Sequence, residues 1–291
     1  MADRLRPLWN FDDLDASERR LTAQLAEEAT PSGRAEVLTQ LARVEALRGD
    51  FDRGEQIVDE AEALAGESEV ARARVDLERG RLRRSSGNVE ASLPLFESAF
   101  AVAMEASEIF IAADAAHMAA LAAGSREGCL AWTERGIELA ENAADPADRY
   151  WLGPLLNNLG WEYYDAGEYD EALRAFERAL EERERDSTNR AAIELALFAV
   201  AKALRVLGRA TEGAPLLERA VSSAAEDKRS DAWVHEELAE TYAALGRQED
   251  AREQARIAIP LLSNGDPDFT PDSERAERLR TLAAAADTRG D

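Results

Sequence analysis

Apolar residues recur at helical spacing along most of the chain, and the clearest run lies on the two sides of Gly167. Ahead of this glycine, one helix face at positions i, i+3, i+4 and i+7 carries Leu156, Leu159, Gly160 and Tyr163. Behind it, a second face with helical spacing carries Ala172, Phe176, Ala179 and Leu180. The pattern predicts two helices joined by a tight turn at the glycine.

The same unit can be aligned along the chain on its turn glycine. These glycines, 37 to 43 residues apart, are Gly49, Gly87, Gly124, Gly167, Gly208 and Gly246. Five residues after them stand Gly54, Ser92, Cys129, Ala172, Gly213 and Ala251. Seven residues further on stand Ala61, Ala99, Gly136, Ala179, Ala220 and Ala258. Seven residues before the glycines stand Ala42, Gly80, His117, Gly160, Ala201 and Ala239. Because nearly all of these residues are small, as closely approaching helices require, the sequence predicts six helix-turn-helix repeats.

The second and third repeats match the pattern less well. Arg79 and Arg83 stand where the second repeat should be apolar, and Ala116 and Ala120 are undersized in the third.

The pattern resembles the tetratricopeptide repeat (TPR), which has Leu-Gly and then Tyr in its first helix, and Ala, an aromatic residue and Ala in its second. These positions are matched by Leu159, Gly160, Tyr163, Ala172, Phe176 and Ala179. Leu156 replaces the usual Trp, and Glu184 stands where a Pro often closes the repeat. The spacing exceeds the usual 34 residues, which is similar to the kinesin-light-chain subclass. The resemblance implies an all-α fold, a right-handed α-solenoid of about six TPR repeats with capping helices at both ends.

The repeat pattern divides the chain into three segments. Residues 1–34 are expected to form an N-terminal arm and capping helix, 35–262 the TPR array, and 263–291 a C-terminal capping helix and frayed tail. A capping box at Asp15 and Glu18 predicts the start of the first helix, and Asp272 is expected to cap the last one.

The first 14 residues are not obviously helical but are rich in apolar side chains, namely Leu5, Leu8, Trp9, Phe11 and Leu14. Such a segment is usually packed on its own domain. A partner-binding arm is the alternative that the sequence leaves open.

The 291-residue chain carries a net charge of −24, so nucleic acid and anionic membrane surfaces are not expected as partners. A single cysteine, Cys129, excludes an internal disulfide and fits a reducing compartment. The first residues contain no apolar signal-peptide core. These features favour a cytoplasmic location.

The TPR resemblance implies that certain positions of each first helix point into a concave groove. The side chains at these positions, the candidate partner-binding residues, are Arg43, Arg74, Arg81, Arg84, Asp114, Asn157, Asn158, Trp161, Tyr164, Lys202, Arg205, Trp233, Glu236, Glu237 and Glu240. Arginines bind carboxylates bidentately, asparagine amides can pair with a peptide backbone, and tryptophans are common apolar anchors. The plainer alternative is that Arg81 and Arg84 pair with Glu78 and Asp76 on their own helix. Trp161 could equally pack between neighbouring helices.

No catalytic or metal site is expected. His117 and Asp114 share a helix face, but an internal hydrogen bond explains them better than a metal or proton relay. Two histidines and one cysteine do not assemble a zinc site, and Cys129 occupies a position that requires a small buried residue. Dinucleotide, P-loop, nucleophile-elbow and zinc-protease motifs do not occur, so we expect neither enzyme activity nor a cofactor.

The sequence therefore predicts a TPR interaction scaffold or adaptor that binds a peptide or protein segment in its groove. Two alternatives remain open. One is a regulator that responds to a small ligand or peptide, and the other is a structural protein that self-associates into a homo-oligomer.

Overall fold

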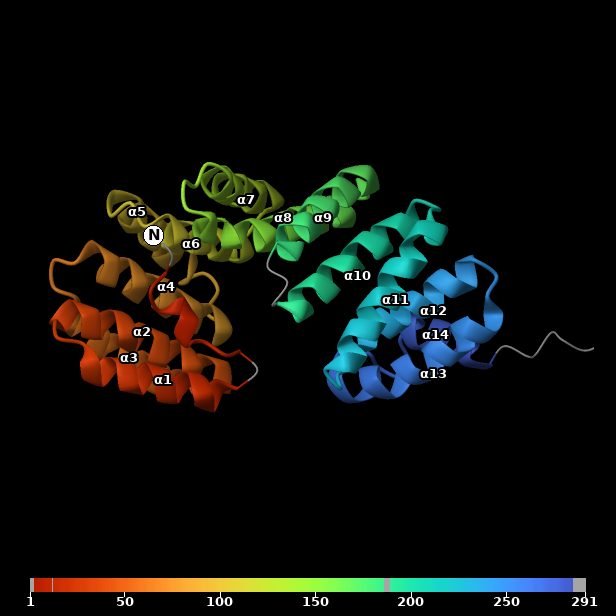
Figure 1. Ribbon diagram of the computed structural model, residues 1–291, viewed down its shortest axis with the longest axis horizontal. Coiled ribbons are helices and arrows are strands. Elements are labelled where there is room, and N and C mark those ends of the chain that lie inside the picture. Colours follow the sequence, from red (N-terminus) through yellow and green to blue (C-terminus); the bar gives the residue numbers. More distant parts are fainter. Residues whose placement is uncertain (1–2, 12, 186–188, 285–291) are drawn as a thin grey trace, which may run out of the picture. The chain divides into compact units, whose positions relative to one another are not determined.

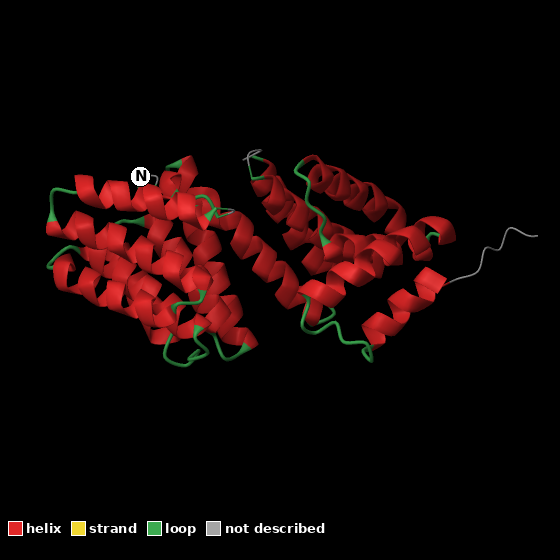
Figure 2. Cartoon of the chain, turned by 90° about the horizontal axis from the view of Figure 1, so that it is seen from below, coloured by secondary structure: helices red, strands yellow, loops and turns green. Residues whose placement is uncertain are grey.

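In the computed structural model, residues 3–11, 13–185 and 189–284 are described. These residues form only helices, and no strand occurs among them (Figures 1 and 2). The elements of the first half are η1 (Arg6–Leu8), α1 (Leu14–Glu27), α2 (Pro31–Arg48), α3 (Phe51–Ala65), α4 (Glu69–Ser85), α5 (Leu93–Glu105), α6 (Ile109–Ala122), α7 (Arg126–Glu141) and η2 (Pro146–Trp151). Those of the second half are α8 (Leu152–Asp165), α9 (Tyr169–Glu184), α10 (Arg190–Val206), α11 (Ala210–Glu226), α12 (Ala232–Ala244), α13 (Gln248–Gly265) and α14 (Glu274–Ala284).

Six consecutive helix pairs, from α2/α3 to α12/α13, form the repeats, which confirms the all-α repeat fold. The turn between the two helices of a repeat contains a left-handed glycine in five repeats, namely Gly49, Gly87, Gly167, Gly208 and Gly246, with φ from 72° to 91°. Gly124 also lies in the turn between its two helices, as predicted, but it is not left-handed. There α6 ends in an extended Ala123, and Ser125 caps α7 by accepting a hydrogen bond from the Gly128 N–H.

The small residues lie where the two helices of a repeat touch. Ala61, Ala99, Ala179 and Ala258 are completely buried. At Gly160 in α8, the ring of Phe176 in α9 lies so close that an added Cβ would overlap it, and Phe96 of α5 lies against Gly80 of α4 in the same way. The repeat pattern of small residues is therefore a pattern of helix contacts.

Replacement of Gly160 with alanine is expected to lower the free energy of unfolding by about 1–3 kcal/mol, because the new methyl group overlaps the Phe176 ring. Gly124→Ala is the matched control. Position 124 has open space around its Cβ and no left-handed φ, so that variant should stay within about 0.5 kcal/mol of wild type. Urea unfolding measures both. Equal effects of the two substitutions would contradict this account of the helix contact.

The contacts divide the chain into two compact units, unit 1 (Met1–Leu155) and unit 2 (Leu156–Asp291). In unit 1, the segment 3–11, α1 and the first three repeats share buried apolar clusters. In unit 2, the last three repeats and α14 do the same. The boundary falls inside α8, where the sequence pattern indicates no break.

The two weaker repeats have local explanations. Arg79 on α4 pairs with Glu55, Asp59 and Glu62 of α3, so an ion-pair row replaces apolar contacts there. In the third repeat, η2 adds bulk against α6. The Trp151 ring lies 5.2 Å from that of His117 and 5.9 Å from that of Phe110.

Both predicted helix starts need correction. The side chain of Asp13, not Asp15, caps α1 by accepting from the Ala16 N–H, because the helix begins two residues earlier than predicted. Asp15 and Glu18 instead pair with Arg48. At α14, Ser273 rather than Asp272 accepts the capping hydrogen bond, from Ala276. The predicted frayed tail lies outside the described residues. Within them, no helix is long and apolar enough to span a bilayer.

Candidate functional site

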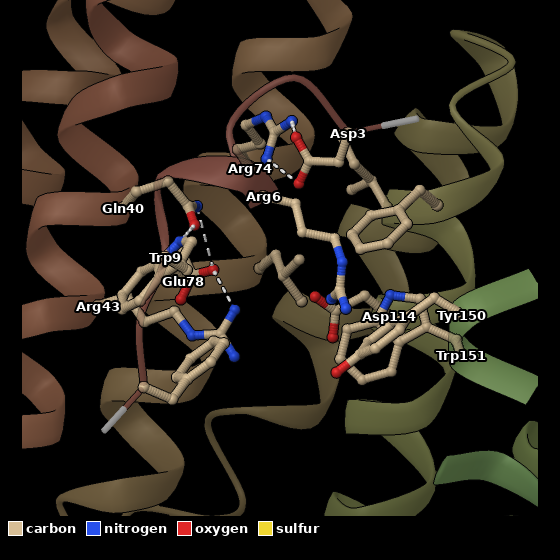
Figure 3. Close-up of a pocket in the computed structure, with 14 residues that line it drawn as sticks. Asp3, Arg6, Trp9, Gln40, Arg43, Arg74, Glu78, Asp114, Tyr150 and Trp151 are labelled. Carbon is tan, nitrogen blue, oxygen red and sulfur yellow. Dashed lines mark hydrogen bonds and ion pairs between the residues drawn. The ribbon is translucent and has the colours of Figure 1, made fainter. Parts of the chain in front are cut away.

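The segment Asp3–Phe11, here called the arm, crosses the face of unit 1 that is formed by α2, α4, α6 and η2 (Figure 3). We call this surface the inner face of unit 1. Leu5 anchors the arm, since its side chain is buried with Leu21, Val37 and Val44 between the arm, α1 and α2. Packing of this segment on its own domain is thereby confirmed.

The start of the arm is fixed by ion pairs. Asp3 accepts from Arg74 of α4 at 2.6 Å, and Arg74 also lies 3.3 Å from Glu36 of α2. Arg4 pairs with Glu28 and with the same Glu36. Burial alone would raise the pKa of Asp3, but the charge and hydrogen bonds of Arg74 outweigh it and leave the pKa below its ordinary value of 3.8. The carboxylate of Asp3 is therefore stabilised in its charged form.

This lowered pKa makes the attachment of the arm dependent on pH. The ion pair contributes fully above the unfolded-state pKa of Asp3 and is lost as the pH falls through its lower folded-state pKa. The stability difference between wild type and Asp3→Asn should be constant above about pH 5 and shrink below about pH 4. Thermal unfolding of both proteins between about pH 7 and pH 3 measures it. If the stability difference between the two proteins did not change with pH, Asp3 and Arg74 would not form a charged pair. Glu36 and Arg4 are the other charged groups beside this pair.

The middle of the arm places Arg6 on aromatic rings. Its guanidinium carbon lies 3.3 Å from the ring centroid of Tyr150 in η2 and 6.0 Å from that of Phe110 in α6 (Figure 3). The Tyr150 and Phe110 rings are themselves stacked, 6.0 Å apart. A guanidinium over such rings gains about 0.5–2 kcal/mol, depending on how far it is desolvated.

The end of the arm places two aromatic rings beside α2. The Trp9 indole N–H donates to Gln40 at 3.0 Å, and the Trp9 ring stacks on Phe11 at 4.8 Å. The guanidinium of Arg43 lies 5.4 Å and 5.5 Å from these two rings. Phe11 remains 53% exposed, so this end of the arm is held less firmly than Leu5.

Beneath the arm lies a buried charge network. Glu78 and Asp114 are almost completely buried, and Arg81 pairs with both. Arg43 lies 3.8 Å from Glu78, a long contact. Burial and the nearby Arg81 lower the pKa of Arg43, although Glu78 and Asp114 act in the opposite direction. A cavity of about 40 Å³ remains between these groups and the arm.

The predicted site residues fall into two groups, one in each unit. In unit 1, Arg43, Arg74 and Asp114 line the cavity, and Arg81 lies beside it. Arg84 is half-buried on the same helix but does not line the cavity. The alternative pairing of Arg81 with Glu78 is confirmed, whereas Asp76 accepts a hydrogen bond from Ser98.

In unit 2, one cluster surrounds Glu237, which is 2% exposed. Arg205 contacts both carboxylate oxygens, and Lys202 lies 3.4 Å away. Burial and the nearby Glu237 raise the pKa of Tyr164. The predicted residues Lys202 and Arg205 thus pair with the predicted Glu237 within this unit.

The acids of the last repeat are held by the C-terminal helix α14. Arg275 contacts Glu236 through two nitrogens, and Arg278 lies 3.2 Å from Glu240. Trp233 is half exposed, and its indole N–H donates to the Asp266 carboxylate. The sequence placed these side chains on the correct helix but did not predict that α14 would pair with them.

Trp161 lies against Tyr164, Phe176 and Phe198 and is half-buried, so its packing between helices is confirmed. Asn157 and Asn158 are half-buried on the same helix, α8. Their predicted contact with a peptide backbone stays a prediction.

Several lining residues were missed, because they lie outside the repeats in the arm and η2, or at positions of the repeat helices that were not predicted to face the groove. These are Asp3, Arg6, Trp9 and Phe11 of the arm, Tyr150 and Trp151 of η2, and Gln40, Leu77, Glu78, Phe110 and Ile111 of the helices. The aromatic content of residues 1–14 was the one signal that pointed to this surface.

The remaining candidates are structural. Asp114 pairs with Arg81, and the His117 ring lies against Trp151. Cys129 is buried. No group of three or more potential metal ligands occurs in the part of the chain that the structure describes.

Comparison with known proteins agrees with the fold. The family model described as tetratricopeptide repeat matches residues 154–186. No curated protein matches the chain significantly. The resemblance to the tetratricopeptide repeat is thus confirmed by sequence over residues 154–186. For the rest of the chain, similarity to solved structures establishes the fold. The kinesin-light-chain subclass stays a prediction.

Three solved structures illustrate the similarity. A signal transduction ATPase with a tetratricopeptide repeat sensor, from Pyrococcus horikoshii, has a TM-score of 0.71 at 15% identity, over 93% of this chain and 41% of its own. The chain thus spans less than half the length of that protein. The apo quorum sensor NprR from B. thuringiensis has a TM-score of 0.62 at 14% identity, over 96% and 85%. A Rap protein complexed with Competence and Sporulation Factor has a TM-score of 0.59 at 15% identity, over 96% and 82%. At these identities the similarity establishes the fold alone.

Proposed function

We propose that this protein of TPR fold is an interaction scaffold that binds a peptide segment of a partner on the inner face of unit 1. One observation carries the proposal. This face already holds a segment of the protein's own chain, the arm, through an ion pair to Arg74, a cation–aromatic contact to Tyr150 and a hydrogen bond to Gln40. Stacked helical repeats commonly present such surfaces to partners.

The chemistry of the face favours a peptide over other ligands. With the arm in place, the remaining cavity of about 40 Å³ is far smaller than the several hundred Å³ of ordinary small-molecule pockets. The net charge of −24 opposes nucleic acid and anionic lipid. Arginine beside aromatic rings, in contrast, is the composition typical of protein interaction sites. A cytoplasmic location and the candidate residues of unit 2 remain further parts of this proposal.

A peptide-responsive regulator is the second candidate function. It is favoured by the similarity in fold to a quorum sensor and to a Rap protein complexed with Competence and Sporulation Factor. Both functions require peptide binding, so the same first experiment serves them. Self-association of the chain is the alternative in which the surface contacts another copy instead.

Selection from a displayed library of random peptides of about ten residues tests peptide binding directly. Wild-type protein should enrich a set of related peptides, and Arg43→Ala combined with Tyr150→Ala should weaken their binding at least about tenfold. Arg174→Ala, an exposed arginine of unit 2, is the matched control and should bind like wild type. Circular dichroism verifies that each variant is helical. No enrichment, or equal binding by the double variant, would contradict the proposal.

A further inference from the structure

We infer that the arm is a tethered ligand, and that the partner peptide it excludes carries an arginine followed three residues later by an aromatic residue. This inference rests on the proposed function and specifies its partner. The motif is the one that the arm itself presents to the inner face of unit 1, at Arg6 and Trp9.

The spacing follows from the backbone of the arm. Residues Arg6–Leu8 form a 3-10 turn, in which the Trp9 N–H donates to the Arg6 carbonyl at 3.1 Å. Because such a turn has three residues per revolution, side chains at i and i+3 project to the same side. Arg6 and Trp9 therefore both point toward the inner face, whereas Pro7 between them is exposed (Figure 3).

The arginine slot consists of aromatic surface above a carboxylate. The Arg6 guanidinium lies over the Tyr150 ring with the Phe110 ring further away, and Asp114 also lines the cavity. Among the described residues, no carboxylate forms an ion pair with Arg6, and its contacts there are with the Tyr150 and Phe110 rings. Lysine lacks the flat guanidinium that stacks on a ring, so the slot favours arginine.

The aromatic slot is formed by α2. Gln40 accepts the indole N–H of Trp9, and the Arg43 guanidinium lies beside the ring. The two slots thus hold the half-buried side chains of Arg6 and Trp9. The anchors Asp3 and Leu5 are buried at other places on unit 1. A partner can replace Arg6 and Trp9 without removing Leu5 from the core.

Tethering makes the arm an effective competitor. A segment linked to its own site acts at an effective concentration of about millimolar. An external peptide with the same motif should therefore bind wild type weakly, and much more tightly once the two arm side chains are removed.

The probe is a fluorescent synthetic peptide with the sequence of residues 3–11, DRLRPLWNF. Fluorescence anisotropy compares its binding to full-length wild type and to the full-length Arg6→Ala, Trp9→Ala variant, which keeps both anchors. The double variant should bind the probe at least about tenfold more tightly than wild type. Adding Tyr150→Ala to the variant should remove that gain. Pro7→Ala is the matched control in the same turn and should bind like wild type.

Three results would overturn the inference. The first is equal binding of the probe to wild type and to the helical double variant, or no binding to the latter. The second is that a probe with alanine at the two motif positions binds the double variant as tightly as the original probe does. The third is that wild type is a dimer and the double variant is a monomer, because the arm would then bind a second copy of the chain. If library peptides bind through Arg43 and Tyr150 but lack the motif, this inference fails and the proposed function stands. If no library peptide binds either wild type or the helical Arg6→Ala, Trp9→Ala variant, the proposed function itself fails.

Discussion

Replacing Arg74 with methionine is expected to lower the free energy of unfolding by about 3–5 kcal/mol. Arg74 is 5% exposed, and its guanidinium is the cation between Asp3 and Glu36. Methionine keeps much of the volume but leaves the buried Asp3 carboxylate without its partner. Removing one member of a buried pair costs more than the pair contributes, because an uncompensated charge remains. Urea unfolding measures the loss.

The same variant should release the arm, so trypsin should cleave after Arg4 faster than in wild type. Arg83→Met is the matched control on the same helix. Its side chain is 42% exposed and pairs with Glu55, so its loss should stay within about 1 kcal/mol. Adding Asp3→Asn to Arg74→Met should restore part of the stability, since the unpaired charge is then gone. If Arg74→Met cost no more than Arg83→Met, the arm would not depend on this ion pair.

Replacing Phe176 with alanine is expected to lower the free energy of unfolding by about 3–5 kcal/mol. The ring is completely buried, and it packs against Trp161 and the backbone of Gly160. Its removal deletes apolar burial and leaves a cavity between α8 and α9. Chemical denaturation, with helicity as the signal, measures the effect.

In the Phe176→Ala background, the effect of Gly160→Ala on the free energy of unfolding should also change. Gly160→Ala is destabilising in wild type because of the Phe176 ring, so in Phe176→Ala it should be neutral or stabilising by up to about 1 kcal/mol, the helix-propensity difference. Phe96→Ala is the matched background, since Phe96 has the same relation to Gly80 in α4 and α5. In that background, Gly160→Ala should keep its full cost. A full cost in both backgrounds would refute the direct contact.

The repeat architecture was predictable because helix packing imposes it on the sequence. Where two helices approach closely, small residues are favoured, and a short link such as that around Gly167 favours a left-handed glycine. Gly124 shows the limit of this reasoning. A serine cap with an extended residue before it makes the same connection without left-handed backbone, and alignment alone does not distinguish the two.

The candidate site was predictable only in part. Repeat register told which side of a helix Arg74, Asp114 and Glu236 occupy, and these positions were identified. It did not reveal that Asp3 of the arm and Arg275 of α14 would pair with two of them, because such partners lie at the chain ends, outside the repeats. Tyr150 was not identified for the same reason, because it lies in η2, a link between two repeats.

Hydrogen–deuterium exchange of the full-length protein, with and without a library-selected peptide, tests the central claim most directly. If the peptide binds the inner face of unit 1 in place of the arm, exchange should slow in α2 around Gln40 and Arg43 and in η2, and quicken in residues 6–11. Slowing confined to unit 2, with no change in the arm, would contradict the account.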